Sequence, residues 1–526
     1  MTLRHRALVA ALVGLLVLAL SPIGRTDPAR PMIVRVHVED AEQAGFLFES
    51  FDETHNHSHG EIELLLWPGD LARLDALGMD YEVVIEDLYA HDMAEAARPK
   101  PVLSLPGPNR SDYRRLADYN AEMKQLAKKK PDLVKLVELP RPSLEGRKIF
   151  GVEIASNVNA TATDGRPIFY IDGLHHAREW PASEYTMLFI HHLAENYGKD
   201  KEITSLLRKV RVIAIPIVNV DGFDYSRESL AQVSLLGAGN GFEGYWRKNR
   251  RSFTGATVPV VQKNPDAYGV DPNRNYAYLW GDQEGGSSGL IINQTYRGAA
   301  PFSEPETQNV RDVILGRNVV GVITNHTYQA TVLRAGGGRA PEDSLLEAIG
   351  AKMAAILGYQ NNGSVGYPTT GTTDDYAYST TGALGFTIEN GSLGFHPAYD
   401  REVGAFTEEH MEAFEVMLDV SANPRYHSVI KGRVAGGAAQ LVLTKTFKTP
   451  LSPGNPTGEK FFIEKINRTL KTRPDGSFEW HLGPSSRPYE SKAESYTLKI
   501  DGASGTKTIQ IRVDRGETIN LGSIQL

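Results

Sequence analysis

The longest stretch of regular hydrophobic patterning runs from about residue 105 to residue 425. Short, nearly continuous apolar runs alternate there with longer segments whose apolar residues recur at helical spacing. Strands that are apolar on both sides are typical of a sheet covered by helices on both faces. We therefore predict an α/β domain with a central mixed sheet. The predicted buried strands are 168–171, 210–218, 319–324 and 384–388.

The patterns on either side of this region differ from it. Residues 30–100 combine short alternating strands with one helix, and they end in a Pro-rich, basic stretch, 93–101, that indicates an exposed linker. From 428 to 526 helical periodicity disappears, and seven short runs predict a β-sandwich. We expect a small α+β domain before the central domain and an accessory sandwich after it. The predicted sandwich strands are 429–434, 440–444, 461–464, 477–480, 496–500, 508–513 and 518–521.

The beginning of the chain resembles a secretory signal. Arg4 and Arg6 precede an apolar run of 14 residues, Ala7 to Leu20. This run is shorter than the roughly 18–20 residues that span a bilayer. We interpret residues 1–29 as a signal peptide and expect a secreted protein. An uncleaved membrane anchor is the alternative.

Composition narrows the chemistry. The 526 residues include no cysteine, which excludes disulfides, thiolate metal sites and cysteine nucleophiles. The net charge is −8, and it gives no general attraction to nucleic acid or anionic membrane. We expect a monomer that does not bind nucleic acid and that contacts membrane only through the signal segment. Any metal must be held by His, Asp, Glu or backbone oxygen.

Candidate metal ligands follow two of the predicted strands. His175, His176 and Glu179 lie between the run 168–171 and the next helix, where α/β sheets usually place a site. A catalytic zinc commonly takes two histidines and one carboxylate and keeps a position open for water. Either histidine could pair with Glu179, and the spacing favours His176. His326, directly after another strand, is the best candidate for the third ligand.

Two further groups suggest substrate handling. Asn273 and Arg274 would suit a free carboxylate, because a guanidinium can donate two parallel hydrogen bonds to it. Glu389 closes the apolar strand 384–388, and such a carboxylate faces either a site or a buried partner. Upstream, a Gly/Pro/Thr-rich loop contains Tyr367, which such a loop would allow to move.

Residues 110–420 resemble the zinc carboxypeptidases of the pancreatic A/B type and their secreted bacterial relatives. Six separate segments match that family in chain order. They are His176-Ala177-Arg178-Glu179-Trp180, Asn219-Val220-Asp221-Gly222, Trp246-Arg247-Lys248, Asp271-Pro272-Asn273-Arg274-Asn275, Asn325-His326-Thr327-Tyr328, and Tyr367 followed by Glu389.

The resemblance implies a role for each matched residue. His176, Glu179 and His326 would hold one Zn²⁺ per chain, which would activate a water molecule to hydrolyse the C-terminal peptide bond. Glu389 would act as general base, and Arg247 would stabilise the oxyanion. Asn273, Arg274 and Tyr367 would bind the terminal carboxylate of a peptide or protein substrate, with Arg178 at a neighbouring subsite.

The resemblance extends to the regulation and the specificity of this family. Residues 77–87 resemble the end of its activation peptide, a domain that covers the cleft before proteolysis, and Arg98 and Lys100 are candidate cleavage points. Asp374 stands where B-type enzymes carry the acid that selects basic side chains. Arg334 is close enough in our alignment to neutralise that acid.

Two alternative functions remain open from the sequence. One is a hydrolase of peptidoglycan stem peptides with the same fold, which the intact Asn273-Arg274 pair disfavours. The other is a catalytically inactive peptide-binding relative, which the presence of Glu389 and of all three ligand candidates disfavours.

Overall fold

The structure is a computed structural model of the chain. It describes residues 30–526 except 59, 68, 160–163, 237–241, 254–268, 283–285 and 364–368. The predicted signal peptide, 1–29, and Tyr367 lie outside the described residues.

The centre of the molecule is a mixed sheet of eight strands, in the order β11-β10-β12-β9-β7-β8-β6-β5. The four strands β12, β9, β7 and β8 run parallel to their neighbours in this group, and the strands on both flanks include antiparallel pairs. All residues of β7, β9 and β12 are buried, as their continuous apolar runs predict. The strands are β5 (Val134–Glu138), β6 (Phe150–Ile154), β7 (Ile168–Gly173), β8 (Arg211–Ile215), β9 (Val319–His326), β10 (Thr331–Arg334), β11 (Gln360–Asn362) and β12 (Leu384–Glu389).

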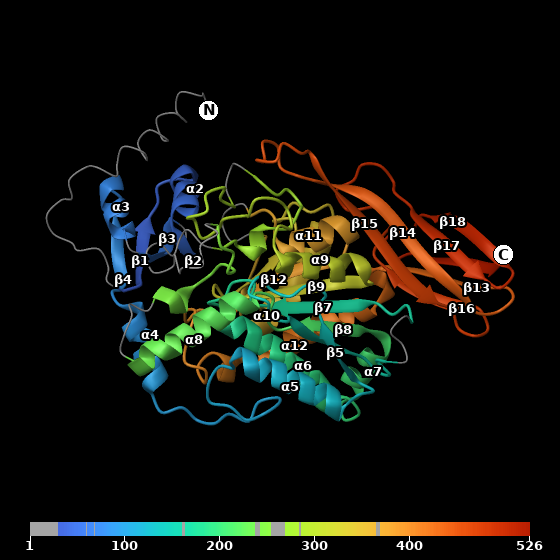
Figure 1. The fold of residues 1–526 in the computed structure, drawn as a ribbon, viewed down its shortest axis with the longest axis horizontal. Helices are drawn as coiled ribbons and strands as arrows, with labels where there is room; N and C mark the ends of the chain where they lie inside the picture. Colours follow the sequence, from blue (N-terminus) through green and yellow to red (C-terminus); the bar gives the residue numbers. More distant parts are fainter. Residues whose placement is uncertain are drawn as a thin grey trace.

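Helices cover both faces of this sheet (Figure 1). Helices α6 and α12 pack on each other and on β7 and β9, whereas α9 and α11 contact β9 from the other side. Helix α6 is buried on nearly all sides, and its buried residues include polar side chains such as Glu184, which bonds to Arg114. The helices are α5 (Leu116–Lys129), α6 (Trp180–Asn196), α7 (Lys201–Lys209), α8 (Val220–Leu236), α9 (Pro305–Gly316), α10 (Asp343–Leu357), α11 (Thr373–Thr381) and α12 (Val403–Ala422).

A small α+β domain precedes the central domain. Its four strands have the order β2-β3-β1-β4, and its apolar core lies between the sheet and its helices. Residues 93–97, which we expected in an exposed linker, belong instead to α4, because Asp87 caps that helix by accepting a hydrogen bond from the Ala90 amide. Its elements are β1 (Met32–His37), α2 (Ala41–Ser50), β2 (Asp52–Ser58), β3 (Glu61–Leu66), α3 (Asp70–Leu77), β4 (Tyr81–Ile85) and α4 (Leu88–Ala97).

The C-terminal region forms two sheets with their own apolar core, on the opposite side of the central domain from the N-terminal domain (Figure 1). Buried and exposed positions alternate along β14 and β15, as expected for strands with one face in a core. The sheet orders are β16-β13-β19 and β15-β14-β17-β18. The strands are β13 (Ser428–Val434), β14 (Ala439–Pro450), β15 (Phe461–Lys471), β16 (Ser477–Leu482), β17 (Tyr496–Gly502), β18 (Gly505–Ile511) and β19 (Thr518–Ile524).

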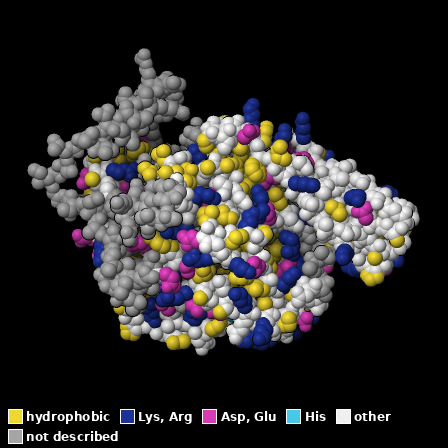
Figure 2. Space-filling view, in the orientation of Figure 1, with side chains coloured by type: hydrophobic (Ala, Val, Ile, Leu, Met, Phe, Trp, Pro, Cys, Tyr) yellow, Lys and Arg dark blue, Asp and Glu magenta, His cyan; other side chains and the backbone are white. Residues whose placement is uncertain are grey.

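The outer surface shows no marked charge separation on the face drawn in Figure 2. Acidic and basic side chains are interspersed there over the central domain and the sandwich. Among the described residues, no helix is both long enough and apolar enough to cross a membrane.

Candidate metal and substrate site

The carboxyl ends of three adjacent parallel strands define the site. In the sheet, β9 lies between β7 and β12, and Glu389 pairs directly with His326 at the end of β12 and β9. The loop that follows β7 carries His176 and Glu179 to the same edge, and α6 begins directly after it. Parallel strands therefore bring together side chains that are far apart in the sequence.

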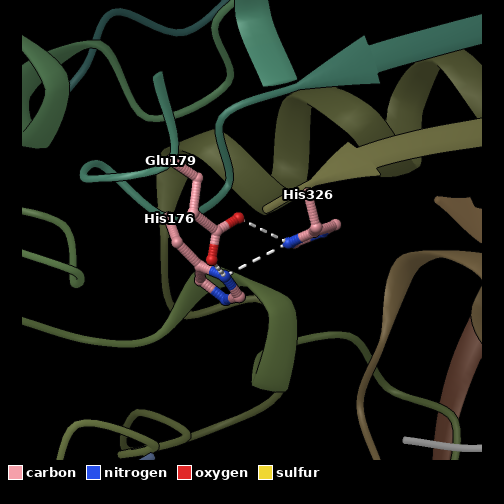
Figure 3. A group of neighbouring side chains, drawn as sticks. All are labelled: His176, Glu179 and His326. Carbon is pink, nitrogen blue, oxygen red and sulfur yellow. Dashed lines mark hydrogen bonds and ion pairs between the residues drawn. The ribbon is translucent and has the colours of Figure 1, made fainter. Parts of the chain in front are cut away.

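Three of these side chains point toward one another in a buried cluster (Figure 3). His176 Nδ1 lies 2.6 Å from Glu179 Oε1, and His326 Nδ1 lies 3.0 Å from Glu179 Oε2 and 3.1 Å from His176 Nδ1. The three ligand atoms lie within 4.8 Å of one another, so a single ion could contact all of them. Two imidazole nitrogens and one carboxylate form a donor set that suits zinc and leaves a coordination position open.

Asp271 supports the metal-binding form of His176. Its Oδ1 lies 3.1 Å from His176 Nε2, so that nitrogen can carry the proton and leave Nδ1 with a free lone pair. Burial, and after it the nearby Arg247 charge, lowers the pKa of His176 and so favours the neutral imidazole. Arg247 in turn donates to Asp271 Oδ2 over 3.0 Å. The buried residues around the cluster thus fit a zinc ion.

His175, the other candidate, lies outside this cluster. Its Nε2 is 2.8 Å from the Tyr276 hydroxyl and 2.9 Å from Thr373 Oγ1, and its Nδ1 is 3.3 Å from Thr324 Oγ1. Both ring nitrogens therefore have hydroxyl partners, and the grouping resolves the ambiguity in favour of His176.

A pocket of about 420 Å³ adjoins the cluster, and His176, Asn273, Arg274 and Glu389 are among its lining residues. A 3₁₀ turn, η5 (Pro272–Arg274), places Asn273 and Arg274 there, and Asp271 caps the turn by accepting from the Asn273 amide. The predicted carboxylate-binding pair, the predicted base and a predicted metal ligand thus line one cavity.

The comparisons with known proteins agree with this geometry. A family model described as zinc carboxypeptidase matches residues 119–413, more than half of the chain. The chain belongs to the zinc carboxypeptidase family. Human carboxypeptidase B is 26% identical over 333 residues, covering 60% of this chain and 72% of the human protein. Carboxypeptidase B of Helicoverpa zea is 28% identical over 319 residues, covering 56% of this chain and 67% of that protein.

The crystal structure of carboxypeptidase A from Helicoverpa armigera has the same fold. It superposes with a TM-score of 0.60 at 24% identity and covers 75% of this chain and 98% of that chain. Together these matches make the protein a peptide hydrolase of the metallocarboxypeptidase class, with the α/β fold that its sequence predicts.

Within this carboxypeptidase, Arg334 does not neutralise Asp374 in the way the sequence left open. Its guanidinium forms two hydrogen bonds to Asp343, at 2.8 and 3.1 Å. Asp374 and its neighbour Asp375 both line the pocket from the first turn of α11. Burial, followed by the Asp374 charge, raises the pKa of Asp375 to about 7. The pocket therefore contains two adjacent acids, and the sequence analysis named only one.

Arg178 forms an ion pair with the N-terminal domain. Its two terminal nitrogens donate to the two oxygens of Asp52 over 2.5 and 2.8 Å, and both side chains are buried. Next to this pair, Tyr245, Tyr328 and Phe395 of the carboxypeptidase domain pack against apolar residues of the N-terminal domain. A residue expected at a substrate subsite thus has its donors occupied by a carboxylate of the same chain.

The sequence analysis did not identify two residues that contact the site: Asp271, the partner of His176, and Asp52, the partner of Arg178. Asp271 stands in one of the six matched segments, and its position two residues before Asn273 was a usable signal. Asp52 gave no signal, because its partner Arg178 is 126 residues away and only the fold brings them together.

Proposed function

We propose that this protein is a secreted zinc metallocarboxypeptidase that removes the C-terminal residue from peptides or proteins. The observation that carries the proposal is that the buried His176–Glu179–His326 cluster opens on the pocket that also contains Glu389 and Arg274. An endopeptidase has no need of a buried cation at the end of its pocket, whereas an exopeptidase uses one to recognise a terminal carboxylate.

Each residue then has a chemical task. His176, Glu179 and His326 would hold one Zn²⁺, and a zinc ion there would supply Lewis-acid chemistry that activates water near neutral pH and polarises a carbonyl. Glu389 accepts a proton from the attacking water and passes it to the leaving amine. Arg247, buried beside the cluster, stabilises the negative charge that develops on the carbonyl oxygen. Asn273 and Arg274, together with Tyr367, orient the substrate's terminal carboxylate.

The central experiment combines metal analysis with peptide hydrolysis. We expect one zinc per wild-type chain and loss of both metal and activity in His176→Ala. Glu389→Gln should keep its zinc but lose about 10²- to 10⁴-fold in kcat, because it removes the proton carrier. Full activity of metal-free His176→Ala would refute the zinc assignment, and an unchanged kcat in Glu389→Gln would refute the base.

The same assay tests exopeptidase character. Amidation of a peptide's C-terminus removes the charge that Arg274 is proposed to bind, and most of the activity should disappear. Equal cleavage of free and amidated peptides would indicate an endopeptidase instead. No hydrolysis by a zinc-loaded chain would favour the inactive peptide-binding alternative.

We further propose mixed specificity, with Lys and Arg released alongside apolar residues. Asp374 and Asp375 favour a cationic side chain, because an apolar one would leave these pocket carboxylates without a counter-charge. The raised pKa of both groups works in the opposite direction, since a protonated carboxyl tolerates an apolar neighbour. Competition kinetics on peptides that end in Lys, Arg, Leu, Phe and Glu tests this, and exclusive release of Glu would contradict it.

Finally, we propose that the N-terminal domain keeps the secreted chain latent as a monomeric zymogen. Asp52 forms a two-point hydrogen-bonded pair with Arg178, the residue proposed for a neighbouring substrate subsite, and so would keep substrate from it. Arg98 is the first candidate for activating cleavage, by a protease that accepts the proline that follows it, because its side chain is 38% exposed, compared with 14% for Lys100. Residues 1–29 would direct secretion and be removed.

A further inference from the structure

The C-terminal sandwich reaches into the substrate pocket. The segment 483–495, which we call the β16–β17 loop, carries Tyr489, and this tyrosine lines the same cavity as Arg274 and Glu389. Its ring stacks on Tyr278, another lining residue, with centroids 5.3 Å apart and planes at 19°. It also meets the ring of Tyr378 edge-on at 5.7 Å. One wall of the pocket is therefore aromatic and comes in part from the accessory domain.

The tyrosine approaches the backbone of the pocket very closely. A Cβ atom on Gly336 would lie 2.5 Å from the Tyr489 hydroxyl oxygen, so only glycine leaves room for the ring. Gly336 also has a φ of 84°, in the region that favours glycine. Its amide donates to Asp375 Oδ1 over 2.6 Å. Tyr489 and the acidic pair thus flank the same glycine.

Buried charges hold the β16–β17 loop in place. Arg487, two residues before the tyrosine, is 7% exposed and donates to Glu494 over 2.9 Å and to the Lys448 carbonyl over 3.0 Å. Glu494 also pairs with Lys445, on β14, over 2.7 Å. A side chain on a loop braced in this way is pre-organised and loses little freedom when a ligand packs against it.

We infer that Tyr489 is a specificity-determining residue of the carboxypeptidase, and that the C-terminal sandwich supplies the wall against which the released side chain packs. The inference rests on the proposed function. The side chains that fit are long and have an apolar or aromatic body, and a cationic end adds the attraction of Asp374 and Asp375. Small terminal residues such as alanine do not reach the ring.

The test is the ratio of kcat/KM values for matched peptides that end in Phe, Arg or Ala. It is measured on the full chain carrying Pro99→Ala, which lets trypsin cut after Arg98, before and after limited trypsin treatment. Tyr489→Ala should lower the Phe/Ala and Arg/Ala ratios about tenfold, the scale on which pocket contacts discriminate. The values for the Ala peptide should stay within about twofold of wild type. Tyr489→Phe keeps the ring and should keep the wild-type ratios.

The matched control is Phe461→Ala, which removes an exposed aromatic ring of the same sandwich that does not line the pocket. It should leave both ratios unchanged. The inference is overturned if Tyr489→Ala changes all three peptides equally, which indicates a general loss of folding, or if it changes none. It is also overturned if Phe461→Ala has the same effect on the ratios.

A separate readout distinguishes failure of this inference from failure of the proposed function. If the cleaved chain with natural Tyr489 hydrolyses none of the peptides, the proposed function is wrong. Calorimetry with free arginine then decides whether Tyr489 belongs to a ligand-binding wall, the part of the inference that does not depend on catalysis. Weaker binding to Tyr489→Ala than to wild type supports the inference. Equal affinity, or no binding to the wild type, overturns it.

Discussion

The N-terminal domain and the C-terminal sandwich both contact the region of the substrate pocket, but they are joined to the carboxypeptidase domain by different chemistry. The N-terminal domain makes the buried Asp52–Arg178 ion pair and side-chain contacts with Tyr245, Tyr328 and Phe395. It is followed by a basic stretch that contains Arg98 and Lys100. One side chain in these contacts, Arg178, is the residue that we propose for a substrate subsite.

The sandwich is attached through the backbone as well as through side chains. Leu279 donates to the Pro450 carbonyl over 2.9 Å, and Ser452 donates to the Trp280 carbonyl over 3.0 Å. Buried Arg468 donates to the carbonyls of Ile314 and Leu315, at the C-terminal end of α9. Helix ends need such partners for their last carbonyls. The N-terminal domain thus covers proposed functional groups and is suited to dissociate after cleavage. The sandwich completes the fold and is suited to stay attached.

Deleting the sandwich should have the largest effect. A chain that ends at His427 would leave the last carbonyls of α9 without Arg468 and the Tyr376 hydroxyl without Glu464, and it would expose Leu315, which packs in the sandwich core. We expect the truncated chain to aggregate or to lose cooperative thermal unfolding, measured by soluble yield and circular dichroism. A soluble truncated chain with wild-type Tm and activity would contradict the contrast between the two domains.

Proteolytic removal of the N-terminal domain should have the opposite outcome. Because proline follows both Arg98 and Lys100, trypsin would not cut the natural linker efficiently, so the test uses Pro99→Ala. We expect limited trypsin treatment of this variant to cut after Arg98 and to raise peptide hydrolysis at least tenfold, because the covering domain can then dissociate from Arg178. The cut site is checked by mass spectrometry and the activity by a peptide of ten or more residues. The same Pro99→Ala chain with Arg98→Gln and Lys100→Gln added is the matched control and should stay latent under the same treatment. Equal activity before and after cleavage would contradict the proposal that the N-terminal domain keeps the chain latent.

The Asp52–Arg178 pair can be tested without any cleavage. Breaking a buried ion pair from one side costs about 3–5 kcal/mol, because the partner charge stays buried and unpaired. In Asp52→Asn, the uncut chain should therefore open about 100- to 4,000-fold more often and approach the activity of the processed enzyme. Activity of the uncut variant is the measurement.

The control for this pair is Glu82→Gln, which weakens the exposed Arg35–Glu82 pair of the same domain. Exposed pairs contribute about 0–1 kcal/mol, so latency should persist in that variant. If both variants behave alike, the buried pair has no special role in closure.

Much of this arrangement was predictable from the sequence, for a physical reason. The strands before His176, His326 and Glu389 are buried on both sides, so their apolar runs stand out. The seven runs of the sandwich were equally clear, although β14 and β15 extend well beyond the predicted segments. A parallel sheet then places its carboxyl ends together, which unites ligands from distant parts of the sequence.

The contacts between domains were not predictable in this way. Tyr489 lies in a loop with no periodic signal. It is 100 residues from Glu389 in the sequence, and the two residues line the same pocket only because the sandwich docks there. Helix α4 was missed because its sequence merges into a Pro-rich stretch, although Asp87 is a good N-cap. Arg334 looked free to neutralise Asp374, yet Asp343, nine residues away, is its partner. Side-chain pairing across elements depends on geometry that local patterns do not contain.

The smallest expected effect is the pH dependence of stability at the interface between the sandwich and the carboxypeptidase domain. Glu464, on β15, is buried and accepts hydrogen bonds from the hydroxyls of Thr449 and of Tyr376 on α11. Burial raises its pKa from 4.5 to about 7. Between these values the folded chain holds a proton that the unfolded chain has released, so the free energy of unfolding falls as pH rises from about 5 to 8, by about 1–3 kcal/mol.

Glu464→Gln tests this effect, because the glutamine amide does not ionise in this pH range. Urea unfolding at four pH values should show the variant gaining stability relative to wild type toward pH 8, whereas Glu459→Gln, at an exposed site of the same sandwich, should follow the wild type. Parallel curves for Glu464→Gln and wild type would mean that this carboxyl is already ionised in the interface, and that the sandwich is held there by charge in the same way as the N-terminal domain.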